Sequence, residues 1–106
     1  MTVYEYTAKP YLVDDGAFQW DDAKAAANYA KHGVTFEVAR SVFTDVFAAE
    51  QIDDRRDYGE ERFTIIGMAN GRLLFVAYTM TGDCIRLISA RGAAPREQRD
   101  YHDGKS

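Results

Sequence analysis

The sequence predicts one α+β domain with the element order ααββββα, in which two N-terminal helices pack on a four-stranded antiparallel sheet and a helix ends the chain. Three observations support this prediction. An alanine-rich segment, residues 22–31, is followed by Gly33; Asn70-Gly71 separates two apolar segments; and Pro95 begins a charged terminal segment. The 106 residues are enough for one domain and too few for two. We therefore expect an N-terminal extension, residues 1–17, and a single domain, residues 18–106.

Two helices are expected near the start of the domain. Asp21 is a good N-cap for the alanine-rich segment, because its carboxylate can accept hydrogen bonds from N–H groups of the first turn. Gly33 suits the left-handed position that follows a helix, and Thr35 caps a second helix over residues 36–43. Trp20, just before the first helix, is expected in the core. Helical spacing predicts a buried stripe of Phe36, Ala39, Val42 and Phe43.

Four strands are expected after the second helix. Asn-Gly is the strongest short hairpin signal, and Gly82-Asp83 provides the next turn. A further short strand, Thr2–Tyr6, is expected in the extension. The four strands are expected at residues 46–52, 62–68, 73–79 and 85–90, and the terminal helix at residues 95–101.

The two tight turns also predict which residues share a face of the sheet. Tyr78 is expected on one face and its neighbour Thr79 on the other. A three-residue second turn would move Arg86 to the face of Tyr78. Two guanidinium groups that flank one strand repel each other unless an anion or a carboxylate lies between them. Two-residue turns predict a cross-strand row of Arg62, Thr79 and Arg86 beside a row of Thr64, Ala77 and Ile88.

The net charge of −4 argues against tight nonspecific binding to nucleic acid, but the charge is unevenly distributed. Residues 1–61 hold six Lys and Arg against thirteen Asp and Glu, a net −7. Residues 62–106 hold seven against four, a net +3. A basic C-terminal half is compatible with a local anion site.

Several classes of protein are not expected. The sequence has neither an apolar run long enough for a membrane span nor a secretory signal, which predicts a cytoplasmic protein without membrane contact. Cys84 is expected to be a small residue at the start of a strand. The two histidines, His32 and His102, form no Cys/His cluster, so we expect no metal site, and no cofactor motif is found.

The residues resemble, in order, the pattern of a known family. Phe18-Gln19-Trp20-Asp21, Lys24, Asn28 and Lys31-His32-Gly33-Val34 resemble the opening F-x-W-D-x-x-K-x-x-x-N-x-x-K-H-G-[VI] of BrnT toxins. The likeness covers about residues 18–101 without interruption. It continues in residues 57–62, 66–67 and 86–91, and in Ala93, Glu97 and Tyr101. Two features depart from the pattern: the long extension before Phe18, and Gly92, where the family often has lysine or arginine.

The resemblance implies a RelE-like fold and a ribonuclease that inhibits translation as the toxin of a type II toxin–antitoxin pair. It implies neutralisation by a BrnA-type antitoxin with a ribbon-helix-helix domain, through which the assembly binds its promoter DNA. It also implies a toxin homodimer within a toxin–antitoxin heterotetramer.

A RelE-like nuclease needs no metal ion, because the RNA 2′-OH attacks the adjacent phosphate while the protein stabilises added negative charge and moves two protons. Arginines suit the first task, so Arg62 and Arg86 are predicted catalytic residues. The alternative is that they form ordinary surface ion pairs with Glu60, Glu61 or Asp83.

Two further catalytic residues are predicted for proton transfer. His32 has a suitable pKa, although a histidine in the last helical turn is also a good C-terminal cap. Tyr78 can donate a proton to the leaving 5′-oxygen, or simply pack against Phe63. Lys24 and Arg91 are predicted RNA contacts; the alternatives are a solvated side chain for Lys24 and an antitoxin contact for Arg91.

A second function stays open at this point. The chain can instead be a non-catalytic antitoxin-binding module that acts as a corepressor, which the acidic N-terminal half and Gly92 favour. Direct DNA binding is disfavoured, because no expected helix is basic along one face.

Overall fold

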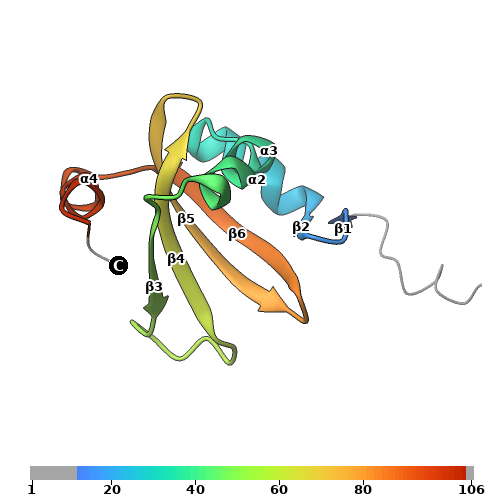
Figure 1. The fold of residues 1–106 in the computed structure, drawn as a ribbon. Helices are drawn as coiled ribbons and strands as arrows, with labels where there is room; N and C mark the ends of the chain where they lie inside the picture. Colours follow the sequence, from blue (N-terminus) through green and yellow to red (C-terminus); the bar gives the residue numbers. More distant parts are fainter. Residues whose placement is uncertain (1–11, 105–106) are drawn as a thin grey trace, which may run out of the picture.

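The computed structural model describes residues 12–104, which form a six-stranded mixed sheet with helices on both faces (Figure 1). The strand order is β1-β2-β6-β5-β4-β3, and neighbouring strands are antiparallel except for β2 and β6. The strands are β1 (Leu12–Asp14), β2 (Phe18–Asp21), β3 (Ala49–Asp53), β4 (Arg62–Ala69), β5 (Arg72–Thr81) and β6 (Cys84–Gly92). The helices are α2 (Asp22–His32), α3 (Phe36–Ala39), the 3-10 helix η1 (Arg40–Thr44) and α4 (Pro95–His102).

The α+β class is confirmed, but the prediction of four antiparallel strands is wrong at one edge of the sheet. There β2 pairs in parallel with β6, with Phe18 opposite Ile85, and β1 pairs with β2. Segments of three and four residues carry too little alternation to be recognised, and the partner of β2 lies far away in the chain. The sheet is therefore larger than the expected RelE-like one. The predicted strand Thr2–Tyr6 lies outside the described residues.

The first helix is confirmed with both of its ends. The Asp21 carboxylate accepts hydrogen bonds from the N–H groups of Ala23 and Lys24, and Gly33 ends the helix with φ 70°. The second helix is shorter than predicted, because α3 ends at Ala39 and the chain tightens into η1. After Arg40, the other four residues of this 3-10 segment are Ser, Val, Phe and Thr, which have modest helix propensity.

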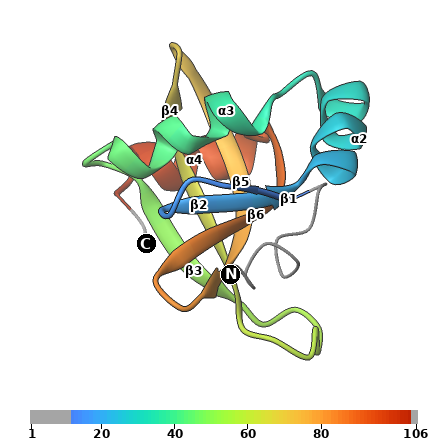
Figure 2. The same cartoon turned by 90° about the vertical axis from the view of Figure 1, so that its right-hand side faces the viewer.

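The core lies between the sheet and the first helices. α3 and η1 lie on one side of the strands and α4 on the other, and α2 lies beside β6 (Figures 1 and 2). Gly67 on β4 allows close packing, since a Cβ there would lie only 2.9 Å from the Cβ of Val42 in η1. The core includes Trp20, Phe36, Val42, Leu74, Val76 and Leu87, each at most 2% exposed, which confirms the prediction for Trp20.

One helix residue closes the edge of β6 beyond the short strand β2. The buried Asn28 side chain accepts a hydrogen bond from the Ala90 N–H at 3.0 Å and donates to the Ala90 carbonyl at 2.8 Å. Its amide also donates to the Val34 carbonyl at 3.0 Å. Asn28 therefore takes the place of a neighbouring strand residue, and leaves no open edge at Ala90.

The predicted hairpins are confirmed, with one irregularity. Asn70 and Gly71 have φ of 52° and 75°, as a two-residue turn of this kind requires, and Ala69 pairs with Arg72. Thr81 pairs with Cys84 around the second turn, so Cys84 does begin a strand. The predicted position of Ile88 is wrong, because a register shift places Ser89, not Ile88, opposite Ala77.

Candidate functional site

Three arginines share the face of the sheet that is turned away from the core. Strand residues alternate between faces, and Val76 and Tyr78 point into the core, so Phe75 and Thr79 point the other way. Arg91 lies opposite Phe75 and Arg86 opposite Thr79. We call this surface the arginine face, and define it by Arg62, Thr64, Phe75, Thr79, Arg86 and Arg91.

The guanidinium groups of Arg62 and Arg86 bind one carboxylate, that of Glu60. Arg86 Nη2 lies 2.9 and 3.0 Å from its two oxygens, and Arg62 Nε lies 3.2 Å from one of them. The side chains of Arg62, Glu60 and Arg86 are 28%, 33% and 36% exposed. The prediction that Thr79 and Arg86 share a row is confirmed. The ion pairs with Glu60 are those of the alternative to the catalytic prediction. An anion binding position thus exists between the two arginines, and a carboxylate fills it.

The ring of Tyr58 packs against the guanidinium group of Arg62. The guanidinium carbon of Arg62 lies 4.2 Å from the centre of the Tyr58 ring. The Tyr58 hydroxyl donates to the Asp53 carboxylate at 3.1 Å, and Asp53 lies opposite Arg62 in the sheet. Sequence reasoning missed this role of Tyr58, although the family-like segment Asp57-Tyr58-Gly59 was a signal for it.

Asp53 is itself held by an arginine. Arg55 donates from Nε and Nη2 to the two carboxylate oxygens at 2.7 and 2.9 Å. These hydrogen bonds, joined by those from the Arg55 N–H and the Tyr58 hydroxyl, lower the pKa of Asp53 to about 2, although burial acts in the opposite direction. The Asp53 side chain is only 4% exposed, so it is a fixed negative charge beside Arg62.

Arg91 anchors the terminal helix. It donates from two guanidinium nitrogens to the two carboxylate oxygens of Glu97, both at 2.8 Å, and lies 4.4 Å above the Phe75 ring. Glu97 also accepts from the Ala94 N–H at 2.8 Å at the start of α4. Burial alone would raise the pKa of Glu97, but the hydrogen bonds from Arg91 and Ala94 lower it overall. The helix is thereby fixed across the end of the arginine face.

Tyr78 lies on the opposite face of the sheet from Arg62 and Arg86. Its ring stacks on Phe63, with centroids 5.3 Å apart, and its hydroxyl donates to the Glu50 carboxylate. Burial and then the hydrogen bond to Glu50 raise the pKa of Tyr78 well above its ordinary value. The structure therefore shows the packing contact and does not bring Tyr78 to the arginine pair.

The two predicted residues of α2 also lie away from the arginine pair. Asn28 of this helix meets β6 at Ala90, four residues from Arg86 and so roughly 13 Å along the strand. His32 is half-buried at the end of α2, one turn further on, and Lys24 is exposed in its first turn. Neither forms an ion pair with another residue in the 12–104 range.

The guanidinium group of Arg72 occupies the space where a side chain at residue 92 would lie. A Cβ at residue 92 would lie 2.7 Å from Nη2 of Arg72. The guanidinium of Arg72 thus lies over the Gly92 backbone, so a cation is present at this strand end although residue 92 has no side chain.

The described part of the chain offers neither a metal-binding cluster nor a membrane-spanning helix. Among residues 12–104, no three His, Cys, Asp or Glu side chains form a group that could hold a metal ion. Over the same residues, no helix is long and apolar enough to cross a membrane.

Comparison with known proteins assigns the chain to one family. A family model described as the ribonuclease toxin BrnT of type II toxin–antitoxin systems matches residues 20–97. No curated protein matches the chain. The matched range covers about three quarters of the 106 residues and includes Arg62, Arg86 and Arg91. The chain belongs to the BrnT family of ribonuclease toxins of type II toxin–antitoxin systems.

Proposed function

We propose that the chain is a metal-independent endoribonuclease in which Arg62 and Arg86 hold the scissile phosphate. The observation that supports this most is their convergence on the Glu60 carboxylate, because a phosphate offers the same kind of paired anionic oxygens. Both guanidinium groups are partly exposed, so RNA can reach them once Glu60 moves aside.

The reaction needs few groups from the protein. The RNA 2′-OH attacks the adjacent phosphorus, the bond to the 5′-oxygen breaks, and the products are a 2′,3′-cyclic phosphate and a 5′-OH. One proton leaves the 2′-OH and one is delivered to the 5′-oxygen. Arg62 and Arg86 stabilise the charge that develops on the phosphate oxygens, which a permanently charged, fixed donor does most effectively.

The Glu60 carboxylate is in direct contact with both arginines. When a phosphate replaces the Glu60 carboxylate between the two arginines, Glu60 stays beside the site because it lies on the adjoining loop. It is then the best placed group to accept the 2′-OH proton. We also propose roles in proton transfer for His32 and Tyr78, and RNA contacts for Lys24 and Arg91. A separate substitution of each residue tests its role.

Cleavage of single-stranded RNA in the presence of EDTA tests the function. We expect products that end in 2′,3′-cyclic phosphate, and a fall of roughly 100-fold or more in kcat for Arg62→Ala and Arg86→Ala. Arg99→Ala, an exposed arginine of α4, is the matched control and should keep full activity. Cleavage that requires a divalent metal, or that survives both substitutions in folded protein, would contradict the proposal.

In the cell we propose a cytoplasmic toxin that inhibits translation, is neutralised by a BrnA-type ribbon-helix-helix antitoxin, and contacts promoter DNA only through that antitoxin. The proposed assembly is a heterotetramer with a toxin homodimer. The family supports an antitoxin partner, and copurification with the neighbouring gene product, followed by mass determination, tests its identity and stoichiometry.

One observation favours a non-catalytic antitoxin-binding module instead. Arg62, Arg86 and Arg91 are all already bound to carboxylates, as on a surface that needs no further anion. Failure of the purified chain to cleave any RNA, with or without ribosomes, while it still binds its antitoxin, would support this second function.

A further inference from the structure

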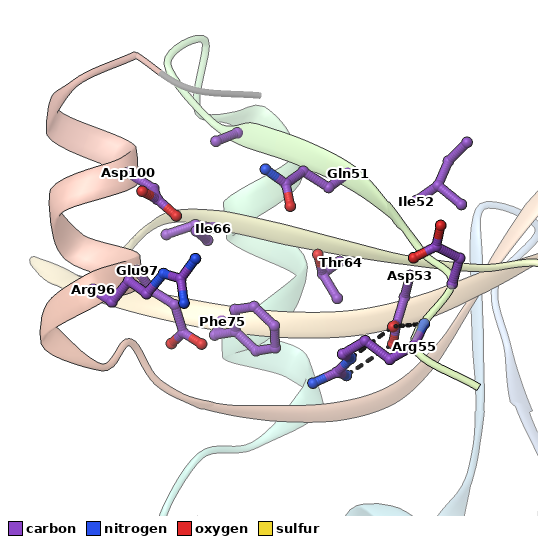
Figure 3. A pocket seen from close by; sticks show the side chains of 12 residues that line it. Gln51, Ile52, Asp53, Arg55, Thr64, Ile66, Phe75, Arg96, Glu97 and Asp100 are labelled. Atoms are coloured by element: carbon purple, nitrogen blue, oxygen red, sulfur yellow. Dashed lines mark hydrogen bonds and ion pairs between the residues drawn. The ribbon is translucent and has the colours of Figure 1, made fainter.

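A groove of about 300 Å³ runs along the arginine face between β3, β4 and α4 (Figure 3). Its floor is formed by Thr64, Ile66 and Phe75, and Gln51 stands on the wall formed by β3. Three charged residues of α4, Arg96, Glu97 and Asp100, form the opposite wall. The groove thus combines a largely apolar floor with polar walls, as small-molecule sites do.

The charged residues that line the groove differ in whether they form ion pairs. Asp53 and Glu97 are bound by Arg55 and Arg91, whereas Asp54, Arg96 and Asp100 form no ion pair with another residue of the described chain. Arg96 and Asp100 lie four positions apart, so a helix presents them side by side. A guanidinium donor and a carboxylate acceptor therefore stand next to each other above the groove.

We propose that this groove binds a nucleobase of the RNA and prefers guanine. Guanine presents an acceptor, O6, beside two donors, N1–H and N2–H, which match Arg96 and the two oxygens of Asp100. Uracil presents one donor between two acceptors, and the carboxylate repels those acceptors. The flat base lies against Ile66 and Phe75. The carboxylates that line the groove, those of Asp53, Asp54, Glu97 and Asp100, keep the phosphate backbone outside it.

The position of the groove agrees with the proposed nuclease, on which this inference rests. Thr64 on the floor is two residues from Arg62 on the same strand, a distance of roughly 7 Å. Asp53, which also lines the groove, lies opposite Arg62. A nucleotide whose phosphate is bound by Arg62 and Arg86 can therefore place its base in the groove.

Cleavage of oligonucleotides of twelve uridines, unmodified or with one internal G, A or C, tests the preference. We expect kcat/KM for the G-containing oligonucleotide to exceed that of the all-uridine one by roughly tenfold or more. Asp100→Asn should remove most of this difference, whereas the control Asp103→Asn, exposed at the end of α4, should keep it. Equal cleavage of all four oligonucleotides would overturn the groove proposal and leave the nuclease intact.

A binding measurement separates this proposal from the nuclease. In NMR titrations, 5′-GMP should shift the amide signals of Gln51, Ile66 and Phe75 more than 5′-UMP does, and Asp100→Asn should abolish the difference, even if the protein cleaves nothing. The proposal would be overturned if 5′-GMP shifted only the signals of Arg62 and Arg86. It would also be overturned if the antitoxin shifted the groove signals and 5′-GMP did not, which would identify the groove as a protein interface.

Discussion

Arg62 and Arg86 share the Glu60 carboxylate, which lies between their two guanidinium groups. Two guanidinium groups that flank one strand of a sheet repel each other, and Glu60 removes that repulsion. The same carboxylate competes with a phosphate for the same nitrogen donors. Glu60 is therefore expected to affect substrate binding and chemistry in opposite directions.

Glu60→Gln should lower KM severalfold, because the competing negative charge is gone, and should lower kcat by roughly 100-fold or more, because a general base is lost. Steady-state cleavage of a labelled oligonucleotide measures both constants. Glu61→Gln, an exposed neighbouring carboxylate, should change neither. An unchanged kcat with a lowered KM would show that Glu60 only occupies the phosphate position and does not accept the proton.

Asn28→Ala should lower the free energy of unfolding by about 2–4 kcal/mol, because it leaves the Ala90 N–H and two carbonyls without partners in a buried place. Urea unfolding measures the loss, and hydrogen exchange should become faster at the Ala90 amide. Ala27→Ser on the exposed side of α2 should stay within about 0.5 kcal/mol of the parent. An equally small effect of Asn28→Ala would mean that water replaces the side chain.

Asp53 makes stability depend on acid pH. Its pKa is about 2 in the folded protein and 3.8 when unperturbed, so its contribution is complete above about pH 4 and is lost as the pH falls towards 2. Asp53→Asn should be less stable than the parent at pH 6, and the difference should shrink between pH 4 and pH 2. Urea midpoints measured across this range check the prediction, and a constant difference would contradict it.

Gly67→Ala should destabilise the protein by about 1–3 kcal/mol. The added Cβ would lie 2.9 Å from the Val42 Cβ and 3.0 Å from the Val42 carbonyl oxygen, so η1 must move away from β4. Thermal unfolding measures the effect, with Met68→Leu at the exposed neighbouring position as the control. An unchanged melting temperature would show that η1 adjusts at no cost.

Much of the site followed from local pattern. The turns at Asn70-Gly71 and Gly82-Asp83 set the register, and the register predicted Thr79 and Arg86 as a pair. The extra residue in β6 could not be predicted, because a bulge depends on how two whole strands fit together. The contact between Tyr58 and Arg62 could not be predicted either, because the loop that carries Tyr58 has no periodic hydrophobic pattern.

The sequence by itself determined the helix caps, the hairpins, the core stripe and the family, because each depends on residues close together in the chain or on an ordered motif. Tertiary structure alone decided that β2 joins β6 in parallel, that one glutamate lies between two arginines, and that α4 makes a wall of the groove. These contacts join distant segments, and their geometry is set by how the whole sheet packs.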